Sequence, residues 1–390
     1  MRTPVGREPP LPGDNSVEYY RRKAKDLERE AKIAISTSRT WNYEKLLGHG
    51  SSGVAMLLVE RDLLRSRRPR RAVLKLPLET ATGVGDLIRE ARALDFLRGH
   101  AHIAQRISFT EDVSSFQPRG GRIRRILRRV VNSFRNPPDN LFVYLSRLNR
   151  SDRPALLLEY LENGNLIRIV EQIYDRDLRL PNRLLWGWYH CLVSACVAMT
   201  YAREGPIDQP MKLEVPRRDQ QHLRLAHHDI AFRNVVMDEV DPRVQEHRVT
   251  PKLVLIDFGM ARQGPSGRDA EDSNLEAVNT LMLDLIDPSM LINNRGFHPV
   301  ESDNGFRTMA AGLFNKARLP RLDPELQTLL AHSFRIGADG EPFQRLSLEQ
   351  TFAHTRRGML KPAESYDGQV QESDNYIQAQ LQRLLFDAEW

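Results

Sequence analysis

Acidic and amide side chains of the kind that hold a metal ion occur at two places in the second half of the chain. Asp229 and Asn234 share the stretch Ala-His-His-Asp-Ile-Ala-Phe-Arg-Asn-Val-Val, and Asp257 directly follows the apolar run at residues 253–256. Mg²⁺ prefers oxygen ligands and usually keeps waters and phosphate oxygens in its coordination shell. We therefore expect Asp229 and Asn234 to share one loop and to converge with Asp257 on a magnesium site.

A second pattern, suited to phosphate, lies near the N-terminus. Gly48, Gly50 and Gly53 separate two short apolar runs, at residues 43–47 and 54–59. Without a Cβ atom, a glycine lets backbone N–H groups approach a phosphate closely. A dinucleotide-binding loop would need a helix directly after the glycines. A strand-like run follows instead, so the pattern favours a phosphate-covering hairpin, with an ordinary hairpin as the alternative.

A lysine and a glutamate follow these glycines. Lys75 interrupts the strand-like run at residues 71–76, and Glu90 lies in a helical pattern at residues 86–97. A strand lysine and a glutamate on the next helix can form an ion pair that holds the amine against phosphate oxygens. The alternative is an ordinary lysine on an edge strand.

The remaining elements can be read from apolar periodicity. Residues 1–14 are proline-rich and expected to be disordered. A helix is expected from Ser16, and its apolar spacing favours packing on the following domain over binding a partner. Residues 154–161 form a buried strand that ends in a polar linker. Further helices are expected at residues 184–203, 326–334 and 347–354, after Asp272 as a helix cap, and in the closing segment 372–390.

Composition restricts the class of protein. The chain has 390 residues, 41% hydrophobic content and a formal net charge of +6, which points only weakly to anionic partners because both signs of charge are interspersed. Cys191 and Cys196 are expected to be buried thiols, and His100 and His102 to form a turn, in preference to a metal site. We find neither a signal peptide nor a run of about 18 apolar residues, and expect an intracellular, cytoplasmic protein without a transmembrane segment.

A basic amphipathic helix is expected at residues 121–135. Its apolar stripe alternates with arginines that include Arg122 and Arg135. Such a helix suits an acidic membrane surface, a calmodulin-like partner or nucleic acid. It could equally pack on its own domain with the arginines in solvent.

Glycine hairpin, strand lysine, helix glutamate, linker, long helix, acidic loop and Asp-Phe-Gly now follow in a fixed order. Over about residues 41–360 the chain resembles a eukaryotic protein kinase. The resemblance implies an α+β, two-lobed fold with a small β-rich N-lobe and a larger helical C-lobe. The implied divisions are residues 1–40, a disordered segment plus a helix; 41–161, the N-lobe with a basic insertion at about 113–154; 162–362, the C-lobe; and 363–390, a tail.

The resemblance also implies roles for individual residues in binding ATP and Mg²⁺. The glycines would cover the phosphates, Lys75 would bind them, and Glu90 would be its ion-pair partner. Leu158 would be the gatekeeper, with the backbone of Glu159 and Leu161 meeting adenine. The other implied residues are the catalytic Asp229, the metal ligands Asn234 and Asp257, the helix-starting Asp272 beneath the catalytic loop, and Arg345 in the last helical pair.

Departures from the family pattern affect control and substrate. His228 replaces the arginine that reads a phosphorylated activation loop, so we expect that control to be absent. Ala231 replaces a lysine, and Arg233 either supplies the missing positive charge, as in tyrosine kinases, or is a surface arginine. Only residues 260–271 separate Gly259 from Asp272, without an Ala-Pro-Glu segment, so both a peptide platform and the glutamate partner of Arg345 are expected to be missing.

Three functions fit these residues. The first, and the one that we expect, is an atypical protein kinase that transfers the γ-phosphate of ATP to a serine, threonine or tyrosine hydroxyl. The second is a small-molecule kinase that uses the same site on another hydroxyl acceptor. The third is a pseudokinase that binds nucleotide and acts as an interaction module. The complete lysine, glutamate and acidic set favours phosphoryl transfer, and the short segment after Gly259 weighs against a peptide acceptor.

Overall fold

The computed structural model divides the chain into two compact units. One comprises Met1–Arg92 and Gln105–Tyr160, and the other comprises Ala93–Ala104 and Leu161–Trp390. The structure describes residues 15–36, 38, 40–50, 52–61, 69–78, 81–110, 154–201, 211–217, 223–264, 266–287, 297–337 and 345–386. The expected disordered segment at residues 1–14 and the basic helix at 121–135 lie outside these residues.

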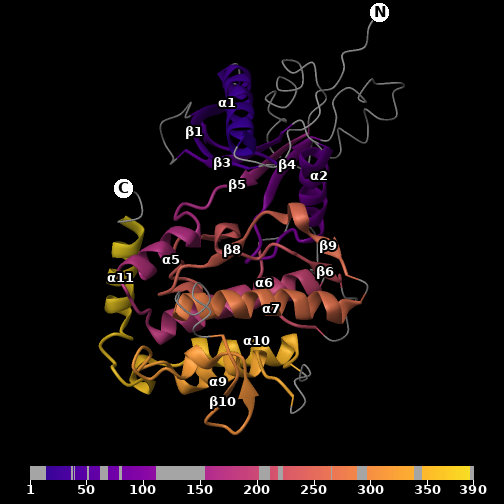
Figure 1. Ribbon diagram of the computed structural model, residues 1–390. Helices are drawn as coiled ribbons and strands as arrows, with labels where there is room; N and C mark the ends of the chain where they lie inside the picture. Colours follow the sequence, from indigo (N-terminus) through magenta and orange to yellow (C-terminus); the bar gives the residue numbers. More distant parts are fainter. Residues whose placement is uncertain are drawn as a thin grey trace, which may run out of the picture. The chain divides into compact units, whose positions relative to one another are not determined.

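A five-stranded antiparallel sheet forms the frame of the first unit (Figure 1). The strand order is β1-β2-β3-β5-β4, so the glycine hairpin occupies one edge. Along β3 the residues alternate between half-buried and buried, the period expected of a strand with one covered face. The strands are β1 (Trp41–His49), β2 (Gly53–Glu60), β3 (Arg71–Pro77), β4 (Arg106–Thr110) and β5 (Ala155–Glu159).

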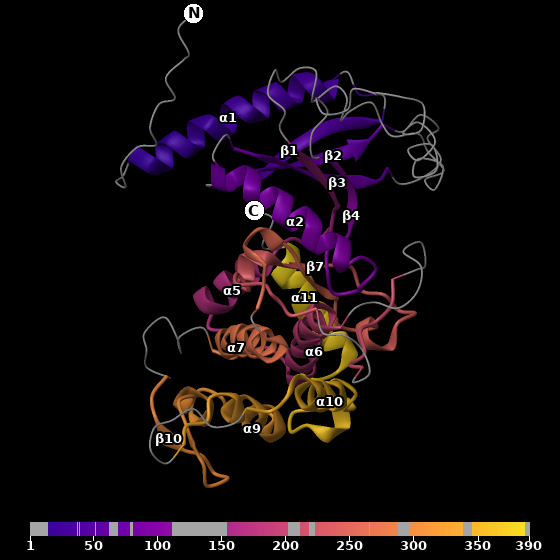
Figure 2. The same ribbon diagram turned by 90° about the vertical axis from the view of Figure 1, so that its right-hand side faces the viewer.

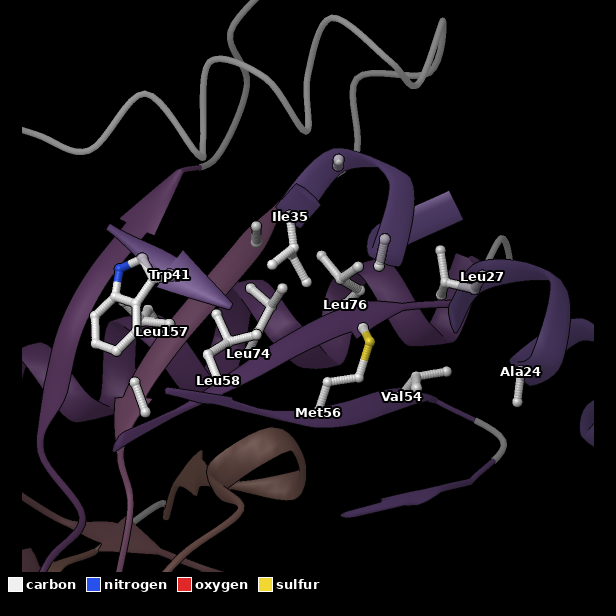
Figure 3. Close-up of a cluster of buried hydrophobic side chains, with 14 of the residues drawn as sticks. Ala24, Leu27, Ile35, Trp41, Val54, Met56, Leu58, Leu74, Leu76 and Leu157 are labelled. Atoms are coloured by element: carbon white, nitrogen blue, oxygen red, sulfur yellow. The ribbon is translucent and has the colours of Figure 1, made fainter. Parts of the chain in front are cut away.

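Helix α1 (Asn15–Ser36) packs on this sheet, as its apolar spacing predicts. Ala24, Leu27 and Ile35 lie on one face of the helix and join a buried cluster with apolar side chains of β2 and β3 (Figure 3). The hydroxyl of Tyr43 on β1 donates a hydrogen bond of 2.6 Å to Glu28. The helix is therefore part of the core of this unit.

Helix α2 (Ala81–Phe96) begins earlier than the predicted residue 86. Its Asp86 accepts a hydrogen bond of 2.9 Å from the hydroxyl of Ser52, which lies in the glycine turn. Glu90 lies one turn further along and is 3% exposed. The first part of α2 thus contacts both the glycine turn and β3.

The second unit is mostly helical and is built around α6 (Asn182–Thr200). Every residue of α6 except Arg183 is buried, so the helix is covered on all sides. It packs against α7 and α10, and α11 lies beside α5 (Figures 1 and 2). At Gly358 a Cβ atom would lie 2.2 Å from the Trp186 ring, which explains the glycine where α10 crosses α6. The other helices are α5 (Leu166–Asp175), α7 (Gly267–Ile286), α9 (Pro324–Ser333), α10 (Leu348–Met359) and α11 (Asp374–Phe386).

The expected cap of α7 is wrong. Ser266 caps this helix, and its hydroxyl accepts a hydrogen bond of 3.1 Å from the Asp269 N–H. Asp272 therefore lies inside the helix, because the serine satisfies the first free N–H groups more than a turn earlier. Asp269 in the first turn supplies the negative charge that favours a helix N-terminus.

Asp284 on α7 gives a pH-dependent prediction. Burial raises the pKa of this carboxyl to about 7, and its Oδ1 atom has no hydrogen bond in the described part of the chain. Because the folded pKa exceeds the unfolded value, this residue's contribution to stability is complete below about pH 4 and is lost as the pH rises through 7. We expect Asp284→Asn to raise the melting temperature at pH 8 by about 2 °C or more and to leave it unchanged at pH 4.5. Thermal melts across this range test the prediction, and an equal shift at both pH values would contradict it.

These two units establish a mixed α+β architecture, with a small antiparallel sheet in the N-terminal part and a helical C-terminal part. The strands predicted around the glycines, Lys75 and residues 154–161 are all present. Within the described ranges, no helix combines the length and the apolar character needed to cross a membrane.

Candidate functional site

In the second unit, a two-stranded hairpin brings Asn234 and Asp257 to the same end. Strands β7 (Val235–Met237) and β8 (Leu253–Leu255) pair antiparallel. The Ile256 N–H donates a hydrogen bond of 2.9 Å to the carbonyl of Asn234, which extends the pairing by one step. Asn234 directly precedes β7 and Asp257 directly follows Ile256, so both leave the hairpin at one end.

Asp229 is held next to Asn234 by the Asn234 side chain. The Nδ2 group of Asn234 donates hydrogen bonds of 2.8 Å to the backbone carbonyl of Asp229 and 2.8 Å to its Oδ2 atom. A short 3-10 turn, η1 (Phe232–Asn234), positions the amide. Because both bonds use the amide nitrogen, Oδ1 is the atom of Asn234 that remains to bind a cation.

Arg233 contacts the other oxygen of the same carboxylate. Its guanidinium donates to Oδ1 of Asp229, while 58% of the Arg233 side chain stays exposed. An ion pair this exposed stabilises the fold by about 0–1 kcal/mol. The arginine is thus an exposed residue in contact with Asp229, and its role in transfer stays a prediction.

His227 links this loop to the strand that leads to Asp257. Its Nε2 atom lies 3.1 Å from the carbonyl of Ile256, and its Nδ1 atom lies 3.2 Å from the Asp229 N–H. These partners fit a neutral imidazole that donates from Nε2 and accepts at Nδ1. The ring is fully buried and packs edge-on against Phe258, with 4.6 Å between centroids.

Two residues of this site have left-handed backbone conformations. The φ angle is 60° at His228 and 65° at Asp257, a region that residues with a Cβ atom seldom adopt. Such conformations cost about 1–3 kcal/mol and persist where the surrounding contacts enforce them, commonly at functional sites. Here His228 directly precedes Asp229, and Asp257 lies in the turn after β8.

Asn274 on α7 makes hydrogen bonds to the backbone of the loop that contains Asp229. The sequence had placed Asp272 beneath this loop. The Oδ1 atom of Asn274 accepts a hydrogen bond of 3.0 Å from the His227 N–H, and its Nδ2 donates 2.9 Å to the carbonyl of Leu225. The residue is 1% exposed. Asp272 lies two residues before Asn274, about half a helical turn away, so the sequence named the wrong residue of this helix as the one beneath the loop.

This contact leads to a stability prediction. Asn274→Ala removes both hydrogen bonds, one from the backbone of the buried His227 and one to the backbone of the half-buried Leu225. We expect a loss of about 2–4 kcal/mol in the free energy of unfolding, from about 1–3 kcal/mol for each unsatisfied group. Asp272→Ala is the matched control on the same helix and should cost less than about 0.5 kcal/mol. Equal losses in urea unfolding would show that Asn274 does not support the loop.

In the first unit, Lys75 and Glu90 form the expected ion pair. The Nζ atom of Lys75 lies 2.7 Å from Oε1 of Glu90, and the side chains are 17% and 3% exposed. Lys75 comes from β3 and Glu90 from α2. The pair is therefore largely removed from solvent on the Glu90 side.

The three glycines have different structural requirements. A Cβ atom at Gly53 would lie 2.5 Å from the carbonyl oxygen of Leu76, so strand packing demands glycine there. At Gly48 and Gly50 a Cβ atom would meet nothing within 4 Å, and neither residue has a positive φ. Neither packing nor conformation requires glycine at these two positions. Glycine would be required there if a ligand approaches the backbone closely.

The residues predicted to meet adenine, Glu159 and Leu161, lie where the chain passes from the first unit to the second. Glu159 ends β5, and its carboxylate accepts a hydrogen bond of 2.8 Å from the Gln105 N–H. Leu158 is buried in the sheet, and Leu161 belongs to a small apolar cluster of the second unit with Ala104 and Val254. The side chain of Glu159 therefore has a structural role, and the contact of its backbone with adenine stays a prediction.

The segment after Gly259 is even shorter than the sequence indicated. Because α7 begins at Gly267, residues 260–266 form the whole connection, and β9 (Arg262–Gln263) within it pairs with β6 (Leu225–Ala226). Residues 260–266 contain no glutamate that could pair with Arg345, as predicted. Arg345 lies 2.7 Å from Glu276 on the exposed side of α7, so the helix supplies the carboxylate.

Comparison with known proteins adds no relative to this description. No protein-family model matches the chain, and no curated protein sequence matches it.

Proposed function

We propose that the chain is an ATP- and magnesium-dependent phosphotransferase with a two-lobed, protein kinase-like fold. The observation that carries the proposal is that Asn234 and Asp257 leave the β7–β8 hairpin at the same end, while the Asn234 side chain also binds Asp229. The buried Lys75–Glu90 pair and the two glycines that packing leaves unexplained support it from the first unit. The α+β architecture is compatible with the proposal.

The donor set fits magnesium. Asp257 offers carboxylate oxygens and Asn234 offers an amide oxygen, the hard ligands that Mg²⁺ prefers, and the remaining positions suit waters and phosphate oxygens. Bound magnesium would neutralise charge on the phosphates. Asn234 also holds the Asp229 carboxylate, so a ligand and the expected proton acceptor share one side chain.

The residues have separable roles in the transfer. Lys75 binds the α- and β-phosphates, and Glu90 keeps its amine in place. Asp229 orients an acceptor hydroxyl and takes its proton as the new P–O bond forms and the bond between the γ-phosphorus and the bridging oxygen breaks, which releases ADP. Arg233 contacts Asp229 and adds positive charge beside the transferred group.

A small molecule is the acceptor that the structure supports better than a peptide. Family members that phosphorylate proteins use the segment after the metal motif as a platform, and here residues 260–266 are partly taken up by pairing with β6. A serine, threonine or tyrosine side chain remains the alternative acceptor.

The test is magnesium-dependent transfer from γ-labelled ATP by the full chain. Separate reactions contain mixed proteins or a panel of sugars, amino alcohols and hydroxylated aromatic compounds. Label in a small molecule supports both parts of the proposal, and label in protein overturns the choice of acceptor. Binding of ATP without any transfer, including to water, would overturn the phosphotransferase and favour a nucleotide-binding pseudokinase.

A further inference from the structure

A cluster of metal-binding side chains lies inside the second unit, apart from the acidic loop. It consists of His102 in the turn after α2, Cys191 in the middle of α6, and His247 in the short helix η2 (Gln245–His247). One nitrogen of each histidine and the sulfur of Cys191 all lie within 4.8 Å of one another. The three residues are 0%, 1% and 3% exposed. Three segments distant in sequence thus direct ligand atoms at one buried point.

His102 is fixed in an orientation that suits a metal ligand. Its Nδ1 lies 2.5 Å from Oε2 of Glu214, and its backbone N–H donates 2.9 Å to Oε1 of the same carboxylate. Its carbonyl accepts a hydrogen bond of 2.9 Å from the Leu255 N–H. Histidines that bind metal through one nitrogen commonly donate the other N–H to a carboxylate, which sets the tautomer and the ring orientation. Nε2 of His102, which is buried and has no hydrogen bond within the part of the chain that the structure describes, is then the ligand atom.

The ring nitrogens of His247 also indicate a missing ligand. Among the described residues, neither of its ring nitrogens makes a hydrogen bond with normal geometry, although the ring is buried. Its backbone is held by hydrogen bonds to Val244 and from Asp241, so the loop fixes the ring where it is. Buried polar atoms normally find a partner, because leaving them unsatisfied destabilises the fold. A cation among the three side chains would give one nitrogen of each histidine a partner.

Ligand type and charge limit the choice of ion. A thiolate with two imidazoles suits Zn²⁺ and also copper, whereas Mg²⁺ requires oxygen ligands. The thiolate of Cys191 and the carboxylate of Glu214 together balance the two positive charges of zinc. At normal zinc–ligand bond lengths, the ligand atoms of a tetrahedral site lie about 3.3–3.8 Å apart, so each side chain needs to move by less than about 1 Å.

We propose that His102, Cys191 and His247 bind a zinc ion, with a water as the fourth ligand and Glu214 orienting His102. The ion would join α6 to the turn after α2 and to the loop that contains η2. This site shares no ligand with the proposed magnesium site, and the zinc proposal does not depend on phosphoryl transfer.

The metal content of variants tests the site. The full chain is produced in zinc-supplemented medium and assayed by elemental analysis after desalting. We expect about one zinc per chain for wild type and for Cys196→Ser, and less than about a tenth of that for Cys191→Ser. Cys196 is the matched control because it is a buried thiol on the same helix and lies outside the cluster. Cobalt-loaded protein should show a thiolate charge-transfer band that Cys191→Ser removes and Cys196→Ser retains.

A measurement on wild type avoids the risk that a variant misfolds. Removal of zinc by a chelator should lower the melting temperature by about 5 °C or more, and added zinc, but not added magnesium, should restore it. His247→Ala should lose the zinc and show no response to the chelator. Folded wild type that binds no zinc when supplied with it, or equal zinc in Cys191→Ser and Cys196→Ser, would overturn the proposal and leave a metal-free His102–Glu214 pair.

Discussion

Replacing Asp257 with asparagine is expected to reduce magnesium-dependent ATP turnover by about 10³-fold while the protein stays folded. The change removes one negative charge from the proposed ligand set at almost unchanged volume. Asparagine also tolerates the left-handed conformation at position 257, where φ is 65°. A loss of activity in this variant would therefore arise from metal binding and not from backbone strain. Turnover is measured as ADP formation against magnesium concentration.

Asp238→Asn is the matched control for this variant. Asp238 lies at the other end of the β7–β8 hairpin, where its carboxylate lies 3.0 Å from Lys252. It is a carboxylate on the same hairpin and takes no part in the proposed site, so its turnover should stay within about twofold of wild type. A raised magnesium requirement in Asp257→Asn alone would identify a metal ligand. Unchanged turnover in Asp257→Asn would remove Asp257 from the site.

The elements of the fold that rest on hydrophobic periodicity were predictable from the sequence. Strands around the glycines and Lys75, and the long apolar helix that became α6, follow from local patterns that a one-sided sheet and a fully buried helix require. Helix ends were less predictable. The cap of α7 moved from Asp272 to Ser266, because several polar residues in succession can accept the same free N–H groups and only tertiary packing selects among them.

The supporting contacts of the site could not be predicted, because they join residues far apart in sequence. Asn274 contacts His227 and Leu225 across the fold, and Arg345 pairs with Glu276 from another element. A signal for Asn274 did exist, since an amide next to Leu275 on the apolar face of a helix requires buried partners. The His102–Cys191–His247 cluster had no such signal: the two histidines and the cysteine fall in three separate segments without zinc-ligand spacing.

The Lys75–Glu90 pair permits stability and nucleotide binding to be measured separately. Lys75→Met removes the amine and leaves the Glu90 carboxylate 3% exposed without its cationic partner. We expect a loss of about 3 kcal/mol in the free energy of unfolding, the typical effect of breaking a buried pair on one side. We also expect ATP to lose its stabilising effect on the melting temperature. Arg71→Met on the same strand should cost less than about 1 kcal/mol, because the Arg71–Glu44 pair is 35% and 29% exposed.

The double variant Lys75→Met with Glu90→Leu separates the two roles. Replacing both members of a buried ion pair with apolar residues of similar volume is often nearly neutral, so most of the lost stability should return. The response to ATP should not return, because the amine that binds phosphate is still missing. If the double variant regained both stability and the ATP-induced shift, Lys75 would have only a structural role. If it regained stability alone, the Lys75–Glu90 pair would serve nucleotide binding, because an apolar pair would stabilise the sheet equally well.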